Sequence, residues 1–318
     1  MKIAILGGGM DMLTLPKALN KWCDDVDCYL AVRHANEKIN GESLGELLNK
    51  SRIRNFIVEN ELEFQGMIRQ KEYDLVLGMG PAWVISRETL KFAGFWVNIN
   101  SIPLPKYMGG AHSTWQLLNG DDIGSIVFQE IGFPVDEGRI LKRFDFSYSL
   151  GHNSPLARLR ENSKQLLHHI EEVMSILLKD PNVSQGFIDP SEAEFWPRLS
   201  TDIHGWIDWQ WTSLEIITFI HAFGDPFEGA KTELLGRIIH FKEAILIEQR
   251  VFHPFSRGII IRHNQDESID VVVADGIIRL NPIFPQTIEL KSLKGLRLHT
   301  PFDKLEKAKK SNLNSEDM

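Results

Sequence analysis

Short apolar segments alternate with helical patterns through the first hundred residues of this chain, and this alternation is what most restricts its fold. Apolar runs separated by helices are typical of a parallel sheet covered by helices on both faces. The expected strands are Ile3–Leu6, Val26–Val32, Phe56–Val58, Asp74–Met79 and Phe95–Asn100. The expected helices lie at Leu13–Lys21, Leu44–Lys50, Leu62–Gln70 and Arg87–Phe92. We therefore predict an α/β N-terminal domain with a Rossmann-like parallel sheet.

The pattern changes after Asp136. Leu156–Leu178 carries apolar residues at helical spacing and predicts one long helix. Beyond Trp206, short alternating strands with turn residues between them favour a small β-barrel or barrel-like domain. These strands are expected at Arg237–His240, Ala244–Gln249, Gly258–Arg262, Ile269–Val273 and Gly276–Leu280. We expect domains at residues 1–200 and 201–318, with a polar tail from Ser311.

Composition is that of an ordinary globular chain, with 43% apolar and 25% charged residues among 318. No apolar run is long enough to span a bilayer, and the apolar start ends too soon at Gly7 for a signal peptide. Cys23 and Cys28 stand outside any metal-ligand spacing and suit a reducing compartment. We expect a cytoplasmic protein with no membrane contact and no metal.

The charge balance bears on the choice of partner. The formal net charge is −8, and from residue 200 onward 14 Lys and Arg face 17 Asp and Glu. A negative chain is poorly suited to a polyanion such as RNA.

The turn Gly7-Gly8-Gly9-Met10-Asp11-Met12 follows the first expected strand and invites a dinucleotide-binding interpretation. That fingerprint requires glycine at its sixth position, where Met12 stands, and an acidic residue after the second strand. NAD binding is therefore disfavoured, and the glycines predict a tight turn or the close approach of another backbone segment.

Two amides and a carboxylate mark a candidate site. Asn98 and Asn100 stand at the end of a buried strand, and Asp136 stands in a turn about thirty-five residues later. In parallel sheets, ligands bind beyond the carboxyl ends of the strands, so these groups predict a polar site there. Taken singly, each amide could instead satisfy local turn hydrogen bonds.

Several motifs in order resemble the N10-formyltetrahydrofolate-dependent formyltransferases. The resemblance covers most of the chain, including a C-terminal module that occurs in methionyl-tRNA formyltransferases and in some sugar-nucleotide N-formyltransferases. Two positions depart from the family pattern, because Asn100 replaces its histidine and Met108 its usual arginine. The matching segments are Asp74–Ile85, Leu104–Gly110, Trp115–Asp121, Gly124–Gln129, Val135–Ile140, Ile207–Trp209, Phe219–Phe223 and Pro226–Ala230.

The resemblance implies a role for each site residue. Asn98 would donate to the oxyanion, Asp136 would accept a proton, and Asn100 would stand where the family has its acid–base group. The formyl donor would be N10-formyltetrahydrofolate, without a metal. Its implied contacts are Gly80, Trp83, Ile85 and Val135. The implied contacts of the acceptor substrate are Lys106, Tyr107, Met108, Gly109 and His112.

Asn100 leaves three interpretations open, because an amide does not titrate near neutral pH. The chain could be an engineered variant that traps both ligands unreacted. It could be a natural enzyme that uses Asp136 with water, or with His112. It could also be a protein that binds a folate or an amino sugar without transferring anything.

The expected acceptor is an amino-deoxysugar linked to dTDP or UDP, as used in bacterial lipopolysaccharide biosynthesis. The diphosphate would need positive groups, for which Lys106 and the segment 139–143 are candidates. Charge makes tRNA the less favoured acceptor. A methionyl-tRNA formyltransferase and a noncatalytic folate- or nucleotide-sugar-binding protein remain the alternatives. The C-terminal module could support a homodimer.

Overall fold

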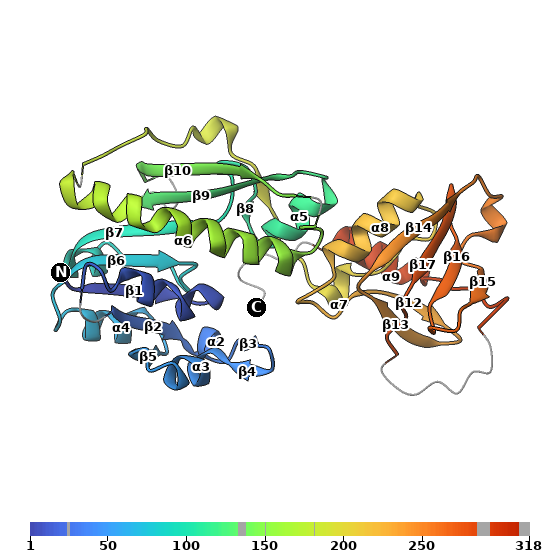
Figure 1. Ribbon diagram of the computed structural model, residues 1–318, viewed down its shortest axis with the longest axis horizontal. Coiled ribbons are helices and arrows are strands. Elements are labelled where there is room, and N and C mark those ends of the chain that lie inside the picture. The colour runs from blue at the N-terminus through green and yellow to red at the C-terminus, as the bar shows by residue number, and fades with distance from the viewer. Residues whose placement is uncertain (24–25, 133–137, 150, 181, 285–292, 312–318) are drawn as a thin grey trace. The chain divides into compact units, whose positions relative to one another are not determined.

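The structure is a computed structural model that describes residues 1–318 except 24–25, 133–137, 150, 181, 285–292 and 312–318 (Figure 1). The chain divides into two compact units, and neither is continuous in sequence. The sequence-based boundary at residue 200 differs from this division and stays a prediction. The first unit comprises Met1–Lys106, Ile123–Ser147 and Glu161–Glu194, and the second comprises Tyr107–Asp122, Tyr148–Arg160 and Phe195–Met318.

A seven-stranded sheet in the order β10-β9-β7-β6-β1-β2-β5 forms the centre of the first unit (Figure 1). Its five strands from β7 to β5 are parallel, which confirms the predicted parallel sheet. β9 runs antiparallel to β7, and β10 runs antiparallel to β9, so the complete sheet is mixed. The strands are β1 (Ile3–Gly7), β2 (Val26–Ala31), β5 (Asn55–Val58), β6 (Tyr73–Met79), β7 (Ala93–Asn100), β9 (Ile123–Glu130) and β10 (Ile140–Ser147).

Helices cover both faces of this sheet. Ile3 and Ile5 of β1 pack in one core with apolar residues of α1, α3 and α6, whereas Ala4 and Leu6 pack in another with α4. Side chains alternate along a strand, so these two sets lie on opposite faces. The helices are η1 (Met10–Leu13), α1 (Leu15–Leu19), α2 (Val32–Ala35), α3 (Leu44–Lys50), α4 (Glu61–Ile68), η2 (Thr89–Phe92) and α6 (Pro155–Lys179), and smaller elements are β3 (Lys38–Ile39), β4 (Glu42–Ser43) and η3 (Pro190–Glu192).

The glycine-rich turn lies where the strand order reverses, between β1 and β6. A Cβ on Gly7 would lie 2.0 Å from the carbonyl oxygen of Met79, and Gly8 N donates to that oxygen at 3.3 Å. The expected close approach of another backbone segment is therefore confirmed. Only glycine fits at this position, because a side chain would collide with β6.

Asp11 follows this turn in η1 and is only 7% exposed. Burial raises its pKa, and a hydrogen bond with Ser163 opposes the shift. A raised folded-state pKa stabilises the fold below the unfolded pKa, and this contribution is lost as the pH rises through the folded value. Asp11→Asn removes the titration. We expect the unfolding free energy of the variant, relative to the parent, to increase as the pH rises from the unfolded pKa of about 4 towards the raised folded pKa. Urea unfolding across this range tests it, and a pH-independent difference would contradict it.

Antiparallel strands dominate the second unit. Four strands in the order β14-β17-β16-β15 form one sheet, and β12 pairs with β13 in a separate ribbon. Isolated bridges join Glu233 to His299, His240 to Ile283 and Ile259 to Arg297. The predicted strand-rich C-terminal domain is therefore confirmed. Its strands are β12 (Ala230–Leu234), β13 (Arg237–Phe241), β14 (Ala244–Gln249), β15 (Ile260–His263), β16 (Ile269–Val272) and β17 (Gly276–Leu280).

Helices and two short strands complete this unit. Apolar residues of α8 pack with those of the strands in one core, among them Ile216, Ile220 and Phe241. β8 pairs in parallel with β11, so residues far apart in the sequence lie side by side. These elements are β8 (Met108–Gly109), α5 (His112–Leu118), β11 (Phe195–Trp196), α7 (Thr201–His204), α8 (Ser213–Ala222), η4 (Pro254–Ser256) and α9 (Phe302–Lys310).

In the part of the chain that the structure describes, no helix is long and apolar enough to cross a bilayer. Within the same residues, no three His, Cys, Asp or Glu side chains gather as ligands for a metal ion. Cys23 and Cys28 are both buried, and neither forms a disulfide with the other.

Candidate active site

A row of amide side chains occupies the carboxyl end of β7. Asn98 Nδ2 donates to Asn100 Oδ1 at 3.0 Å, and Asn100 Nδ2 donates to Gln129 Oε1 at 3.3 Å. Gln129 Nε2 continues the row by donating to the carbonyl oxygen of Gly138 at 2.9 Å. Asn98 and Asn100 meet because residues two apart in a strand share a face. The row therefore holds both amides of the predicted site in fixed orientations.

Gln129 is a site residue that the sequence analysis missed. It ends the buried run Gly124–Gln129 in β9 and is only 1% exposed. The antiparallel pairing of β7 with β9 places its Cα opposite that of Asn98. A buried glutamine that closes an apolar strand was the available signal, because buried polar groups require partners.

Gln129→Leu should lower the free energy of unfolding by about 1–3 kcal/mol, because the carbonyl of Gly138 and an amide hydrogen of Asn100 lose their partner. Urea unfolding measures this change. Ser125→Ala in the same strand is the matched control, since Ser125 Oγ is buried and has no hydrogen-bond partner among the described residues. We expect that control to be neutral. Equal stability of the two variants would show that the amide row contributes nothing.

The segment that carries Val135 and Asp136 lies outside the described residues, and the structure describes the chain again from Gly138. A Cβ on Gly138 would lie 1.8 Å from the carbonyl oxygen of Glu130, so this position requires glycine. Glu130 N donates to the carbonyl oxygen of Arg139 at 2.9 Å. The chain after Asp136 therefore returns beside β9, where Gln129 also holds it.

The segment predicted to bind the formyl donor follows β6. Gly80 has a positive φ of 60°, and Trp83 packs against the core with its ring centroid 6.4 Å from that of Phe64. Trp83 Nε1 is buried and has no hydrogen-bond partner among the described residues. Ile85 is 5% exposed, so its side chain belongs to the core and only its backbone could face a ligand. Binding of the donor by these residues stays a prediction.

Internal partners hold the arginines suggested for a diphosphate. Arg139 Nε pairs with Glu130 at 3.0 Å, and Arg143 Nε pairs with Asp145 at 2.8 Å. Arg143 also donates to the carbonyl oxygen of Leu104 at 2.5 Å. These contacts fix both guanidinium groups within the first unit. Lys106, at the end of a segment of the same unit, is exposed.

The other residues predicted to contact the acceptor lie in the second unit. Tyr107 is 4% exposed and stacks on Trp196, with ring centroids 5.7 Å apart. Met108 and Gly109 form β8, and a Cβ on Gly109 would lie 2.3 Å from the carbonyl oxygen of Trp196. Packing explains the aromatic ring and the glycine. Contact of this segment with substrate stays a prediction.

His112 is the first residue of α5. Burial lowers its pKa to about 4, so the imidazole is neutral at physiological pH. A neutral imidazole can accept a proton, but the structure assigns His112 and Asn100 to different units. Replacement of the missing histidine by His112 therefore remains a hypothesis.

Comparison with known proteins identifies the C-terminal part of the chain. Residues 200–293 match the sequence model of the family described as formyl transferase, C-terminal domain. Relatives include the bifunctional polymyxin resistance protein ArnA of Wigglesworthia glossinidia brevipalpis, 24% identical over 68% of this chain and 33% of the relative. A methionyl-tRNA formyltransferase of Streptococcus agalactiae is 26% identical over 62% of this chain and 60% of the relative. A GDP-perosamine N-formyltransferase of Brucella melitensis is 26% identical over 57% of this chain and 69% of the relative.

The chain thus spans between 33% and 60% of the first relatives that it matches. Among solved structures, the N-formyltransferase of Helicobacter canadensis in complex with folinic acid and dTDP-3-aminofucose gives a TM-score of 0.61. That comparison covers 89% of this chain and 100% of the other at 15% identity, and therefore supports the fold.

Proposed function

We propose that this chain, which belongs to the formyltransferase family, moves a formyl group from N10-formyltetrahydrofolate to the amine of a nucleotide-linked amino-deoxysugar. The observation that carries the proposal is the amide pair Asn98 and Asn100 at the carboxyl end of β7. The Helicobacter canadensis relative, crystallised with folinic acid and dTDP-3-aminofucose, supports the classes of donor and acceptor.

Asn98 suits the stabilisation of an oxyanion. The amine attacks the formyl carbon, and the carbonyl electron pair becomes an oxyanion until the bond from carbon to N10 breaks. One hydrogen of Asn98 Nδ2 is given to Asn100, and its second hydrogen is available to that oxygen. A neutral amide donates without a change in its own charge. Gly78 leaves space beside it, because a Cβ there would lie 3.0 Å from Asn98 Oδ1.

The groups needed for proton transfer are incomplete in this centre. The attacking amine must lose one proton, and N10 of the departing folate must gain one. Asp136 is the proposed acceptor and relay, working with water. Asn100 maintains the amide row through Asn98 and Gln129 but cannot exchange a proton. We therefore propose a slow transferase whose scaffold is intact.

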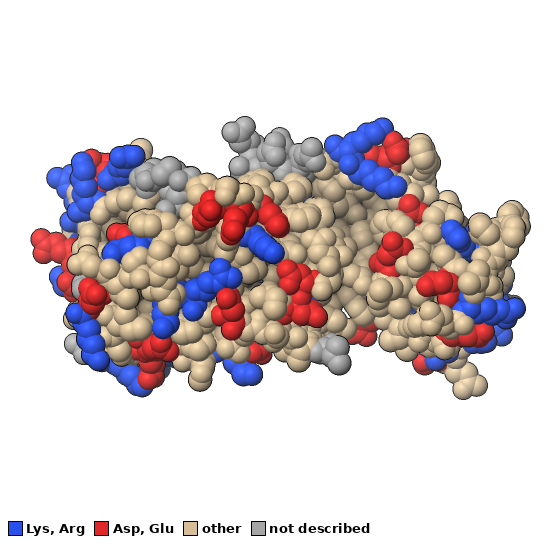
Figure 2. Space-filling view, turned by 90° about the horizontal axis from the view of Figure 1, so that it is seen from above, with Lys and Arg blue, Asp and Glu red and all other residues tan. Residues whose placement is uncertain are grey.

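Charge favours the sugar nucleotide over tRNA. The net charge is −8, and on the face in Figure 2 acidic and basic side chains are interspersed in small groups. A small pocket needs only a few donors for a diphosphate, whereas a tRNA requires an extended basic surface. The product would then serve the assembly of a surface polysaccharide such as lipopolysaccharide.

Two other functions rest on specific observations. The relative from Streptococcus agalactiae, 26% identical, favours a methionyl-tRNA formyltransferase. Asn100, where the family has its histidine, favours a protein that binds these ligands without turnover. The three functions differ in which amine, if any, acquires a formyl group.

The test incubates the chain with N10-formyltetrahydrofolate and one acceptor at a time. The acceptors are dTDP-, UDP- and GDP-linked amino sugars and initiator methionyl-tRNA, and mass spectrometry detects the formylated amine. We expect one amino sugar to be formylated. Formylation of the tRNA alone would overturn the sugar assignment. Binding of 5-formyltetrahydrofolate without turnover of any amine would support the noncatalytic function instead.

A further inference from the structure

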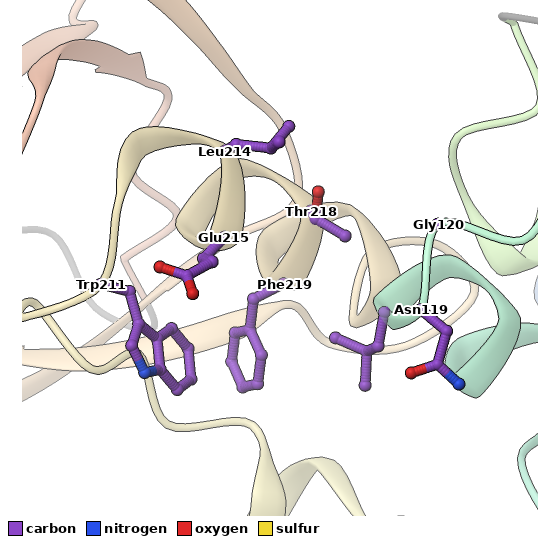
Figure 3. Close-up of a pocket in the computed structure, with 8 residues that line it drawn as sticks. Asn119, Gly120, Trp211, Leu214, Glu215, Thr218 and Phe219 are labelled. Atoms are coloured by element: carbon purple, nitrogen blue, oxygen red, sulfur yellow. The ribbon is translucent and has the colours of Figure 1, made fainter.

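The second unit contains a pocket of about 420 Å³ that the proposed reaction does not use. The end of α5 with the turn after it, Trp211 and one side of α8 form its walls (Figure 3). Its lining includes Leu118, Asn119, Trp211, Leu214, Glu215 and Phe219. None of them was assigned to formyl transfer. The volume lies within the usual range for small-molecule sites.

Two aromatic rings form a corner of this pocket. The ring centroids of Trp211 and Phe219 are 4.9 Å apart, and the rings are inclined by 61°. Figure 3 shows both rings pointing in the same direction, whereas Leu214 points away from them. A tryptophan face carries negative electrostatic potential and attracts cations.

A carboxylate lines the same pocket as these rings, that of Glu215 (Figure 3). Glu215 Oε2 accepts from Thr212 N and from Thr212 Oγ1, each at 2.7 Å, which completes the capping box of α8. These hydrogen bonds lower the pKa of Glu215, so it is ionised at neutral pH. Both of these hydrogen bonds go to Oε2, and among the described residues Oε1 has no hydrogen-bond or ion-pair partner. The pocket therefore presents a negative charge whose position is fixed by the hydrogen bonds to Oε2.

Positive charge is absent from the described residues that line the pocket. Arg257 donates to the carbonyl oxygen of Gln210 at 3.1 Å and to Gln210 Oε1 at 2.9 Å, but it does not line the cavity. The carboxylate of Asp275 lies at the start of α8, where its Oδ1 accepts from Ser213 N at 2.6 Å. It adds a second negative charge near Glu215. Phosphates and carboxylates are therefore unfavourable ligands here.

We infer that this pocket binds a small organic ammonium ion with an apolar body. The ammonium group would lie between Glu215 Oε1 and the face of Trp211, where it gains an ion pair and a cation–π contact. The apolar body would pack against Leu118 and Phe219. Asn119, at the rim, adds an amide for any polar substituent. This ligand class differs from the anionic nucleotide and folate of the proposed reaction, so the site is independent of that function.

The test uses benzylammonium as the probe, with benzoate and benzyl alcohol as isosteric controls. The indole N–H signal of Trp211, assigned with Trp211→Phe, is followed by ¹H–¹⁵N NMR. We expect benzylammonium to shift this signal saturably, with a dissociation constant on the order of 1 mM. Benzoate should leave it in place, and benzyl alcohol should bind more weakly.

Glu215→Gln keeps a side-chain oxygen for the capping box and removes the charge. We expect it to weaken benzylammonium about 3–10-fold, the effect of an exposed ion pair with an aromatic neighbour. Glu228→Gln removes the same charge from an exposed position outside the pocket and should change nothing. Equal binding of benzyl alcohol, tighter binding of benzoate, an unaffected Glu215→Gln variant or an unmoved Trp211 signal would each overturn the inference.

Discussion

Asn100→His is expected to raise the rate of formyl transfer by about 10²–10⁴-fold, the usual contribution of a positioned general acid–base group. Asn100 sits in the amide row between Asn98 and Gln129, so a ring at this position would lie beside the proposed oxyanion donor. An imidazole can take a proton from the attacking amine and return it to the folate nitrogen, which an amide cannot do. Steady-state rates with the best amino-sugar acceptor measure the effect.

A matched control separates acid–base chemistry from a simple change of shape. Asn100→Gln introduces a longer side chain that does not titrate, and we expect no increase in rate. With Asn100→His, the rate should also acquire a dependence on a group that titrates near pH 6.5, which is absent from the parent. If Asn100→His is as slow as Asn100→Gln with every amino sugar and with initiator tRNA, the transferase assignment fails.

Asp136→Asn is expected to abolish transfer, with a loss of about 10²–10⁴-fold. The residue lies outside the described part of the chain, but Gly138 beyond it is tied to Gln129 at 2.9 Å. We therefore expect the carboxylate to face the amide row and to accept the proton of the amine. The loss should be measured both in the parent and together with Asn100→His, where the larger signal makes it easier to quantify.

Glu137→Gln provides the comparison for this experiment, because it removes a charge from the next residue of the same turn. We expect it to retain most of the activity. Full activity of Asp136→Asn combined with Asn100→His would show that the carboxylate is dispensable, and that water or another group accepts the proton.

The parallel strands could be predicted because buried strands consist mainly of consecutive apolar residues, which can be seen in the sequence. β1 and β2 are buried at every position, and apart from Asp27 in β2 they appear as apolar runs. β10 was not predicted, since it carries Lys142, Arg143 and Asp145 and lies at an edge of the sheet. An edge strand pairs on one side only and tolerates charges that a central strand does not.

The amide row shows how far the site could be predicted. Asn98 and Asn100 were recognised because both lie at one strand end, two residues apart. Gln129 comes opposite Asn98 only through the pairing of β7 with β9, which no local pattern reveals. A resemblance of motifs likewise gave no information on burial. It therefore could not separate Tyr107, which packs on Trp196, from residues that face a ligand.

The division into units also depends on contacts between distant segments. Thr114 Oγ1 donates to the carbonyl oxygen of Ala222 at 3.2 Å, and β8 pairs with β11. These contacts draw segment 107–122 into the second unit, although it precedes β9 in the sequence. Composition changes along the chain mark no boundary there, so the sequence predicted a single one near residue 200.

A crystal structure of the chain with 5-formyltetrahydrofolate and an amino-sugar nucleotide is the decisive test of whether the end of β7 is the formyl-transfer centre. We expect N10 of the bound folate to lie beside Asn98 Nδ2, with the sugar amine close to N10 and within reach of Asp136. The nucleotide base would be identified in the same map. A folate analogue bound away from Asn98 and Asn100, with the end of β7 left to solvent, would contradict the assignment of this centre to formyl transfer.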